Sequence, residues 1–133
     1  MLIEKENPEL NSFSPLSLAF IGDTVFDMLV RTELLLEANR PVKELHKLAS
    51  GEVCAKAQSE KIKKVLPLLT EEESEIFKRG RNAHPGSLPK NQSPADYHYA
   101  TGLESLFGWL YLGGNEERIK ELYRLMKDDC KTE

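Results

Sequence analysis

The sequence of 133 residues has few cysteines and histidines and lacks any long hydrophobic run. Its two cysteines, Cys54 and Cys130, form no CxxC pair, so reduced thiols are expected instead of a disulfide framework. The three histidines show no HxxxH-type spacing, which argues against a zinc site. No apolar run approaches the roughly 20 residues that a membrane-spanning helix needs, so no membrane contact is expected.

The N-terminal segment, MLIEKENPEL, is acidic and polar, which is unlike a signal peptide. A cytoplasmic location is therefore expected. Hydrophobic residues make up 40% of the sequence and charged residues 30%, as in ordinary globular domains. A chain of this length can bury one real hydrophobic core, so we expect a single domain over residues 1–133.

The alternation typical of β-strands is absent, and turn dipeptides do not separate short β-rich runs. The sequence instead predicts an all-α fold of about six to seven helices. Ser14-Pro15 and Ser93-Pro94 each join a capping serine to a proline suited to the first helical turn. Thr70 and Glu73 have the spacing of a capping box. The predicted helices cover about residues 15–37, 42–49, 52–65, 71–80, 95–112 and 115–129, with a break at Ser50-Gly51.

The net charge is −4, from 18 basic and 22 acidic residues, which alone argues weakly against nucleic-acid binding. The distribution of charge matters more than the sum. The segment KRGRNAHPGSLPK, residues 78–90, holds four basic residues and no acidic one. Its proline and glycine residues predict a loop after the fourth helix. Such a segment is either a solvated surface loop or a surface that meets an anionic partner.

The stretch from Leu16 to Val30 reads as a helix that is apolar on both sides, which is typical of a buried helix. Asp23 lies near its centre, on the side that carries Phe20 and Phe26. A lone buried carboxylate costs several kcal/mol, roughly, so it has to be neutralised, paired or bound to a metal ion.

A second helix, YHYATGLESLFGWLYL, is also apolar nearly all round and carries Glu104 at its centre. If these helices are neighbours, Asp23 and Glu104 could converge. Mg²⁺ binds carboxylate oxygens and keeps several waters, and a bound ion can activate water and stabilise charge on a phosphate. The alternative is that each acid is paired with a lysine or arginine, or lies at a helix end.

Both helices resemble a known family. AFIGDTVFDMLV, residues 19–30, resembles the signature helix of ribonuclease III enzymes, and TGLESLFGWLYLGG, residues 101–114, resembles their second conserved helix. The similarity is greatest to the Mini-ribonuclease III subgroup, to which LHKLAS, KRGRNA and PKN are also similar. That subgroup lacks the double-stranded-RNA-binding domain of ordinary ribonuclease III, so no such domain is expected after the second motif.

The resemblance implies an all-helical homodimeric endonuclease that cuts double-stranded RNA with Mg²⁺. Asp23 and Glu104 match the catalytic, metal-binding acids of the family. The substrate implied for the Mini form is the precursor of the large-subunit (23S) ribosomal RNA, and the sequence leaves open whether a ribosomal protein assists. Double-stranded RNA is read mainly through phosphates and 2′-hydroxyls. The residues expected to contact it are Lys78, Arg79, Arg81, Asn82 and Lys90.

Most of the aromatic residues are expected in the core, but Phe20 is expected to pack across the dimer axis. Asp27 is expected to be an outward or paired acid. The sequence departs from ordinary ribonuclease III at Leu16, Ala19 and Thr101, where that enzyme has carboxylates. Water and the Thr101 hydroxyl are therefore expected to complete the metal site. The rival interpretation is a non-catalytic helical RNA- or ribosome-binding dimer, against which the retained pair of acids speaks.

Overall fold

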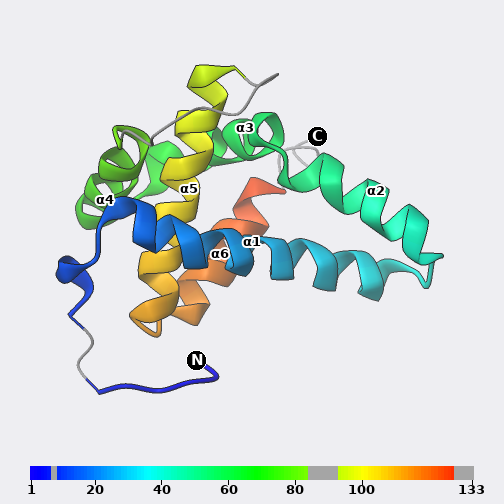
Figure 1. The fold of residues 1–133 in the computed structure, drawn as a ribbon, viewed down its shortest axis with the longest axis horizontal. Helices are drawn as coiled ribbons and strands as arrows, with labels where there is room; N and C mark the ends of the chain where they lie inside the picture. Colours follow the sequence, from blue (N-terminus) through cyan, green and yellow to red (C-terminus); the bar gives the residue numbers. More distant parts are fainter. Residues whose placement is uncertain (7–8, 84–92, 128–133) are drawn as a thin grey trace.

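Six α-helices make up the fold in the computed structural model of the protein, which describes residues 1–6, 9–83 and 93–127 (Figure 1). No strand occurs within these ranges, so the prediction of an all-α fold is confirmed. No helix within them is long and apolar enough to cross a membrane. The helices are α1 Pro15–Glu37, α2 Val42–Val53, α3 Ala55–Val65, α4 Glu71–Arg81, α5 Pro94–Leu112 and α6 Glu116–Met126, with short 3-10 turns at Leu10–Ser12 and Leu66–Leu68.

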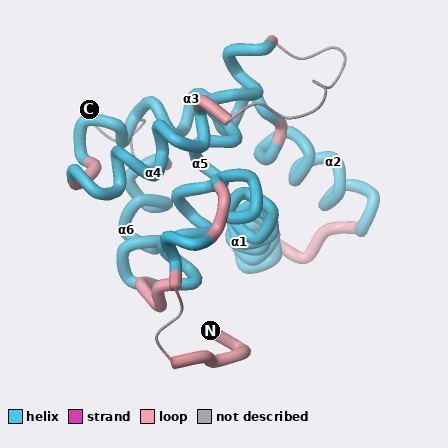
Figure 2. The backbone as a smooth tube through the Cα atoms, turned by 60° about the vertical axis from the view of Figure 1, so that its left-hand side comes forward, coloured by secondary structure: helices cyan, strands magenta, loops and turns pink. Residues whose placement is uncertain are grey.

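Helix α5 lies at the centre and packs against α1, α3, α4 and α6, and its most extensive contact is with α1, which crosses it (Figure 1). Helices α2 and α4 lie on opposite sides of the molecule in both views (Figure 2). The burial of α5 agrees with its sequence, because nearly every residue from Ala100 to Leu110 is buried.

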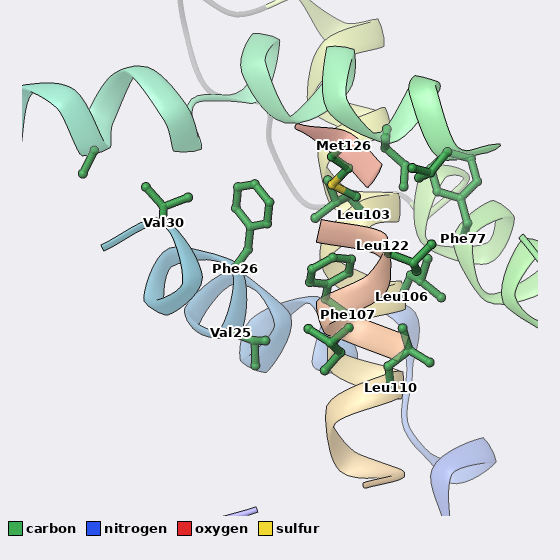
Figure 3. Packing of buried hydrophobic residues seen from close by; sticks show 14 residues of the cluster. Val25, Phe26, Val30, Phe77, Leu103, Leu106, Phe107, Leu110, Leu122 and Met126 are labelled. Atoms are coloured by element: carbon green, nitrogen blue, oxygen red, sulfur yellow. The ribbon is translucent and has the colours of Figure 1, made fainter. Parts of the chain in front are cut away.

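The core is built from apolar side chains of α1, α3, α4, α5 and α6 (Figure 3). Phe26 of α1 and Phe107 of α5 meet edge to face, with their ring centroids 5.9 Å apart. Phe77 from α4 and Leu122 from α6 are also almost fully buried. Burial of such side chains contributes about 1.5–3 kcal/mol each, so this cluster supplies most of the force that holds the helices together.

The helix starts follow the capping signals in the sequence. The Ser14 hydroxyl accepts from the Ser17 amide at 3.1 Å, and the Ser93 hydroxyl accepts from the Asp96 amide at 3.4 Å. The capping box between Thr70 and Glu73 is complete in both directions. Each cap stabilises its helix by about 1 kcal/mol, because it satisfies an amide that has no partner within the helix.

Glu73 also joins α4 to α6. Arg118 donates to both oxygens of its carboxylate, at 2.8 Å each, and to the Leu68 carbonyl at 3.0 Å. Glu73 is buried, and a buried carboxylate that meets an arginine in this two-bond geometry is both neutralised and oriented. The start of α4 is therefore fixed against α6.

The predicted break at Ser50-Gly51 is wrong, because α2 continues through both residues to Val53. A glycine inside a helix costs about 1 kcal/mol relative to alanine but does not forbid the conformation. The break falls at Cys54, whose backbone is extended (ψ 160°), so α3 begins at Ala55. The sixth helix ends at Met126, and the last predicted turn, near Asp129, lies outside the described residues.

The prediction that α1 is buried on both sides is also wrong. Phe20 is 82% exposed, Met28 56% and Leu36 83%. Only one face of α1 points into the core: Leu18, Ala19, Gly22, Val25, Phe26 and Val30. The apolar pattern predicted burial for both sides of α1, but part of this apolar surface stays exposed to water in the single chain.

Two glycines let the backbones of α1 and α5 touch where the helices cross. A Cβ atom built on Gly22 would lie 1.7 Å from the Glu104 carbonyl oxygen, and one built on Gly108 would lie 2.0 Å from the Leu18 carbonyl oxygen. Neither obstacle is a flexible side-chain end, so any larger residue must push the two helices apart.

We expect Gly22→Ala to destabilise the protein by at least about 2 kcal/mol, because the added methyl group collides with backbone that cannot move locally. Gly51→Ala is the matched control, since Gly51 is helical and a Cβ there meets nothing within 4 Å. That change should raise stability by up to about 1 kcal/mol through helix propensity. Urea unfolding of both variants measures the difference, and equal effects would contradict the packing argument.

Candidate active site

The two predicted acids are brought together at the crossing of α1 and α5. Asp23 directly follows Gly22, and Gly22 faces the backbone of Glu104. The Asp23 carboxylate is close enough to that of Glu104 for its negative charge to act on it. Asp23 is exposed to solvent, so the expectation that it is buried is wrong, while Glu104 is partly buried.

Burial, and after it the negative charge of Asp23, together raise the pKa of the Glu104 carboxyl to about 8. A hydrogen bond from Gln58 opposes this rise. In the absence of a cation, Glu104 therefore keeps its proton at neutral pH. A cation placed between the two carboxyl groups would offset the negative charge of Asp23 and so lower the pKa of Glu104.

Gln58 of α3 is the third side chain of the site, and the sequence reasoning missed it. Its amide nitrogen donates to Glu104 Oε2 at 3.2 Å and to the Val53 carbonyl at 2.8 Å. A signal was present, because Gln58 precedes Ile62 and Val65 by one and two helical turns, on the buried face of α3. A polar residue on an apolar helix face is the pattern that singled out Asp23 and Glu104.

The donor set fits a largely hydrated divalent cation. Across the described ranges, no group of three or more histidine, cysteine, aspartate or glutamate side chains could hold a metal ion. Two carboxylates suffice for Mg²⁺, which is typically bound through one or two carboxylates and keeps waters or substrate phosphates in its other positions. Asp23 is exposed, so the pair is open to solvent on one side.

The positions where ordinary ribonuclease III has further acids hold no substitute carboxylate. Ala19 is buried, and Leu16 is 37% exposed. Thr101 is buried, and its hydroxyl donates to the Tyr97 carbonyl at 3.0 Å, a bond within its own helix. Asp27 is paired with Arg31 at 3.0 Å, which confirms that it is a paired acid.

The predicted RNA-binding residues lie in the last turn of α4 and just beyond it. Lys78, Arg79 and Asn82 are exposed, whereas Arg81 is partly buried, with its guanidinium 5.8 Å from the centre of the Phe77 ring. Lys90 lies outside the described residues. The remaining members of this basic group thus extend from a helix end, not only from a loop.

The basic end of α4 is close to the turn of α5 that carries Glu104. A Cβ atom on Gly80 would lie 2.3 Å from the Ser105 hydroxyl oxygen and 3.1 Å from the Gly102 Cα atom. Gly102 and Ser105 flank Glu104 in the sequence. The last turn of α4, which carries the positive residues, therefore packs through Gly80 against the turn of α5 that includes Glu104.

Phe20 is exposed on α1, and it precedes Asp23 by three residues. Residues three apart are neighbours on a helix surface. The predicted dimer contact and the predicted catalytic acid therefore share one side of α1.

Comparison with known proteins agrees with this geometry. The sequence matches the Ribonuclease III domain family over residues 16–115. It is 47% identical over 114 residues to the Mini-ribonuclease 3 of Thermoanaerobacter sp. (strain X514), covering 86% of this chain and 80% of that protein. It is 46% identical over 112 residues to the Mini-ribonuclease 3 of Brevibacillus brevis, covering 84% of each.

The fold is similar to the crystal structure of protein FN1578 from Fusobacterium nucleatum, with a TM-score of 0.79 and 33% sequence identity, covering 87% of this chain and 89% of that chain. Taken with the family match, these similarities show that the chain belongs to the ribonuclease III family. It is an endoribonuclease of that family, and its relatives confirm the predicted resemblance to Mini-ribonuclease III.

The raised pKa of Glu104 predicts a pH dependence of stability in EDTA. The unfolded carboxyl group titrates near 4.5 and the folded one near 8. Between these values the folded protein holds a proton that the unfolded chain has lost, so stability is full below about pH 4.5 and falls as the pH rises through 8. Glu104→Gln should remove this fall and make the protein more stable at pH 8.5 by on the order of 3 kcal/mol.

Urea unfolding from pH 5 to 9 measures this slope. Glu75→Gln is the matched control, because Glu75 is an exposed glutamate on α4 and should leave the slope unchanged. A slope that survives in the Glu104 variant would place the titrating group elsewhere.

Proposed function

We propose that the chain is a Mg²⁺-dependent endoribonuclease that cleaves double-stranded RNA, with Asp23 and Glu104 as its catalytic and metal-binding residues. The observation that carries the proposal is the convergence of these two carboxyl groups at the crossing of α1 and α5. Membership of the ribonuclease III family supports the substrate class.

Each acid contributes in a different way. Bound Mg²⁺ would supply an activated water and stabilise negative charge on the phosphate. Asp23 presents its carboxylate to solvent, where a hydrated ion and an RNA phosphate can reach it. Glu104 lies deeper, bonded to Gln58, and loses its proton when a cation is bound, because a metal ligand must be deprotonated.

The residues proposed to contact RNA are Lys78, Arg79, Arg81, Asn82 and Lys90. The protein as a whole is negative, so a polyanion needs a local positive surface to approach. The exposed cations at the end of α4 offer such a surface close to the turn of α5 that carries Glu104. Contacts of this kind read the shape of a duplex through its phosphates, not its sequence.

The enzyme is proposed to work as a homodimer. Phe20, Met28 and Leu36 leave a set of large apolar side chains on α1 in water in the single chain. Several large exposed apolar side chains on one helix of a small domain suggest an interface, and a second copy of the same chain is the commonest partner. We place Phe20 at that interface.

The proposed natural substrate is the precursor of the large-subunit (23S) ribosomal RNA in the cytoplasm, with a ribosomal protein as a further partner. The similarity to the Mini group supports this assignment. We propose residues 1–133 as one catalytic domain.

Asp23→Asn and Glu104→Gln should each lower the rate of cleavage of a long double-stranded RNA in Mg²⁺ by at least about 100-fold. Asp27→Asn is the matched control, because Asp27 is one turn away on α1 and pairs with Arg31. Its cleavage rate should stay near that of the native protein. RNA binding, measured at several salt concentrations, should be kept by all three variants and should fall steeply with salt.

A native protein that binds duplex RNA without ever cutting it, including a ribosomal precursor, would favour the non-catalytic binder. Full cleavage activity in Asp23→Asn or in Glu104→Gln would show that the substituted residue is not part of the active site.

Phe20→Asp should shift the protein from dimer to monomer in sedimentation experiments, because a charge cannot be buried unpaired in an apolar interface. The matched control is Leu68→Asp, since Leu68 is also apolar and exposed but lies in the Leu66–Leu68 turn, away from α1. This control should leave the dimer intact. A native protein that sediments as a monomer at micromolar concentration would reject the proposed assembly.

A further inference from the structure

We infer that Gln58 is a positioning residue, whose side-chain amide fixes the Glu104 carboxylate for metal binding and thereby sets the rate of RNA cleavage. This inference rests on the proposed function and deepens it, because it adds a third element, α3, to a site built on α1 and α5.

The amide of Gln58 is held in one orientation by its two acceptors. A primary amide has two N–H donors, and both are used, one on the Val53 carbonyl and one on Glu104 Oε2. With the amide reversed, its own oxygen would face the Val53 carbonyl oxygen, which can only accept, and that contact is repulsive. The Val53 carbonyl therefore fixes the orientation in which the amide donates to Glu104.

The Val53 carbonyl is a firm anchor for this contact. Val53 is the last residue of α2, so its carbonyl has no partner within that helix. The bond to Gln58 satisfies this carbonyl and ties the amide to backbone at the junction of α2 and α3. Glu104 is thus oriented from a fixed point and not by another mobile side chain.

The amide of Gln58 is kept at a cost in free energy. Gln58 is 2% exposed, and its oxygen, Oε1, has no hydrogen-bond partner among the described residues. A buried polar atom without a partner costs about 1–3 kcal/mol, so an apolar side chain of similar shape would avoid that cost. Such a side chain would lose both bonds that the amide donates, one to the Val53 carbonyl and one to Glu104 Oε2.

Groups that orient metal-binding side chains in this way have measurable effects. Their removal typically lowers metal affinity or activity by about 10- to 100-fold. Gln58 does not itself reach the open side of the site, because its side chain is buried behind Glu104. Its effect should therefore fall on the metal and on kcat, and not on the binding of RNA.

The test compares Gln58→Met with Ser59→Ala. Methionine has a similar length but no donor. Ser59 is the next residue, is fully buried, and carries a hydroxyl that has no partner among the described residues. Ser59→Ala therefore also removes a buried polar group next to the site, but it removes no contact with Glu104. For Gln58→Met we expect kcat to fall about 10- to 100-fold with KM for duplex RNA unchanged. Ser59→Ala should retain native values.

Mn²⁺ binding, measured by electron paramagnetic resonance without RNA, gives a readout that does not depend on turnover. The dissociation constant for Mn²⁺ should rise about tenfold or more in Gln58→Met and stay unchanged in Ser59→Ala. Native Mn²⁺ affinity and native kcat in Gln58→Met would overturn the inference. So would a kcat that recovers fully at temperatures well below the melting point of the variant, since that result indicates only a structural role at the α2–α3 junction.

Failure of the proposed function would look different. A native protein that binds Mn²⁺ with the expected dependence on Gln58, but does not cleave RNA, overturns the proposed activity and retains the role of Gln58 in metal binding. A native protein that binds no Mn²⁺ overturns both.

Discussion

The backbone contact between α1 and α5 is the constraint on which the rest of the molecule depends. It is made from both sides, by Gly22 against Glu104 and by Gly108 against Leu18. Each glycine gives up about 1 kcal/mol of helix propensity, so the helices accept a local cost for a closer approach. The close approach has two effects. It closes the core around Phe26 and Phe107, and it sets the acid of one helix beside the acid of the other.

The sequence predicted much of this arrangement because the relevant signals are local. Capping at Ser14, Thr70 and Ser93 fixes where three helices begin, and the all-round apolar pattern of α5 identifies the central helix. The two acids were found as polar residues out of place in apolar helices, and the structure brings them together. These inferences needed only the residue types and a period of 3.6.

Prediction from the sequence failed where the outcome depends on how the helices pack against one another. Asp23 was expected to be buried, yet the side of α1 that carries it and Phe20 is exposed, because an apolar pattern does not distinguish a core from a surface that awaits a partner. Gln58 stands out locally as a polar residue on the buried face of α3, but its two partners, on α2 and α5, follow only from how the helices pack. The break likewise falls at Cys54 and not at Gly51, although glycine is the poorer helix former, so propensity alone did not locate it.

Helix α4 is fastened at both ends, by the bonds of Arg118 to Glu73 at its start and by the contact of Gly80 with Ser105 near its finish. A helix that is held at both ends keeps its last turn in place relative to α5. In the proposed enzyme, Lys78 and Arg79 would therefore present their charges to RNA phosphates from a fixed backbone, whatever the sequence of the RNA.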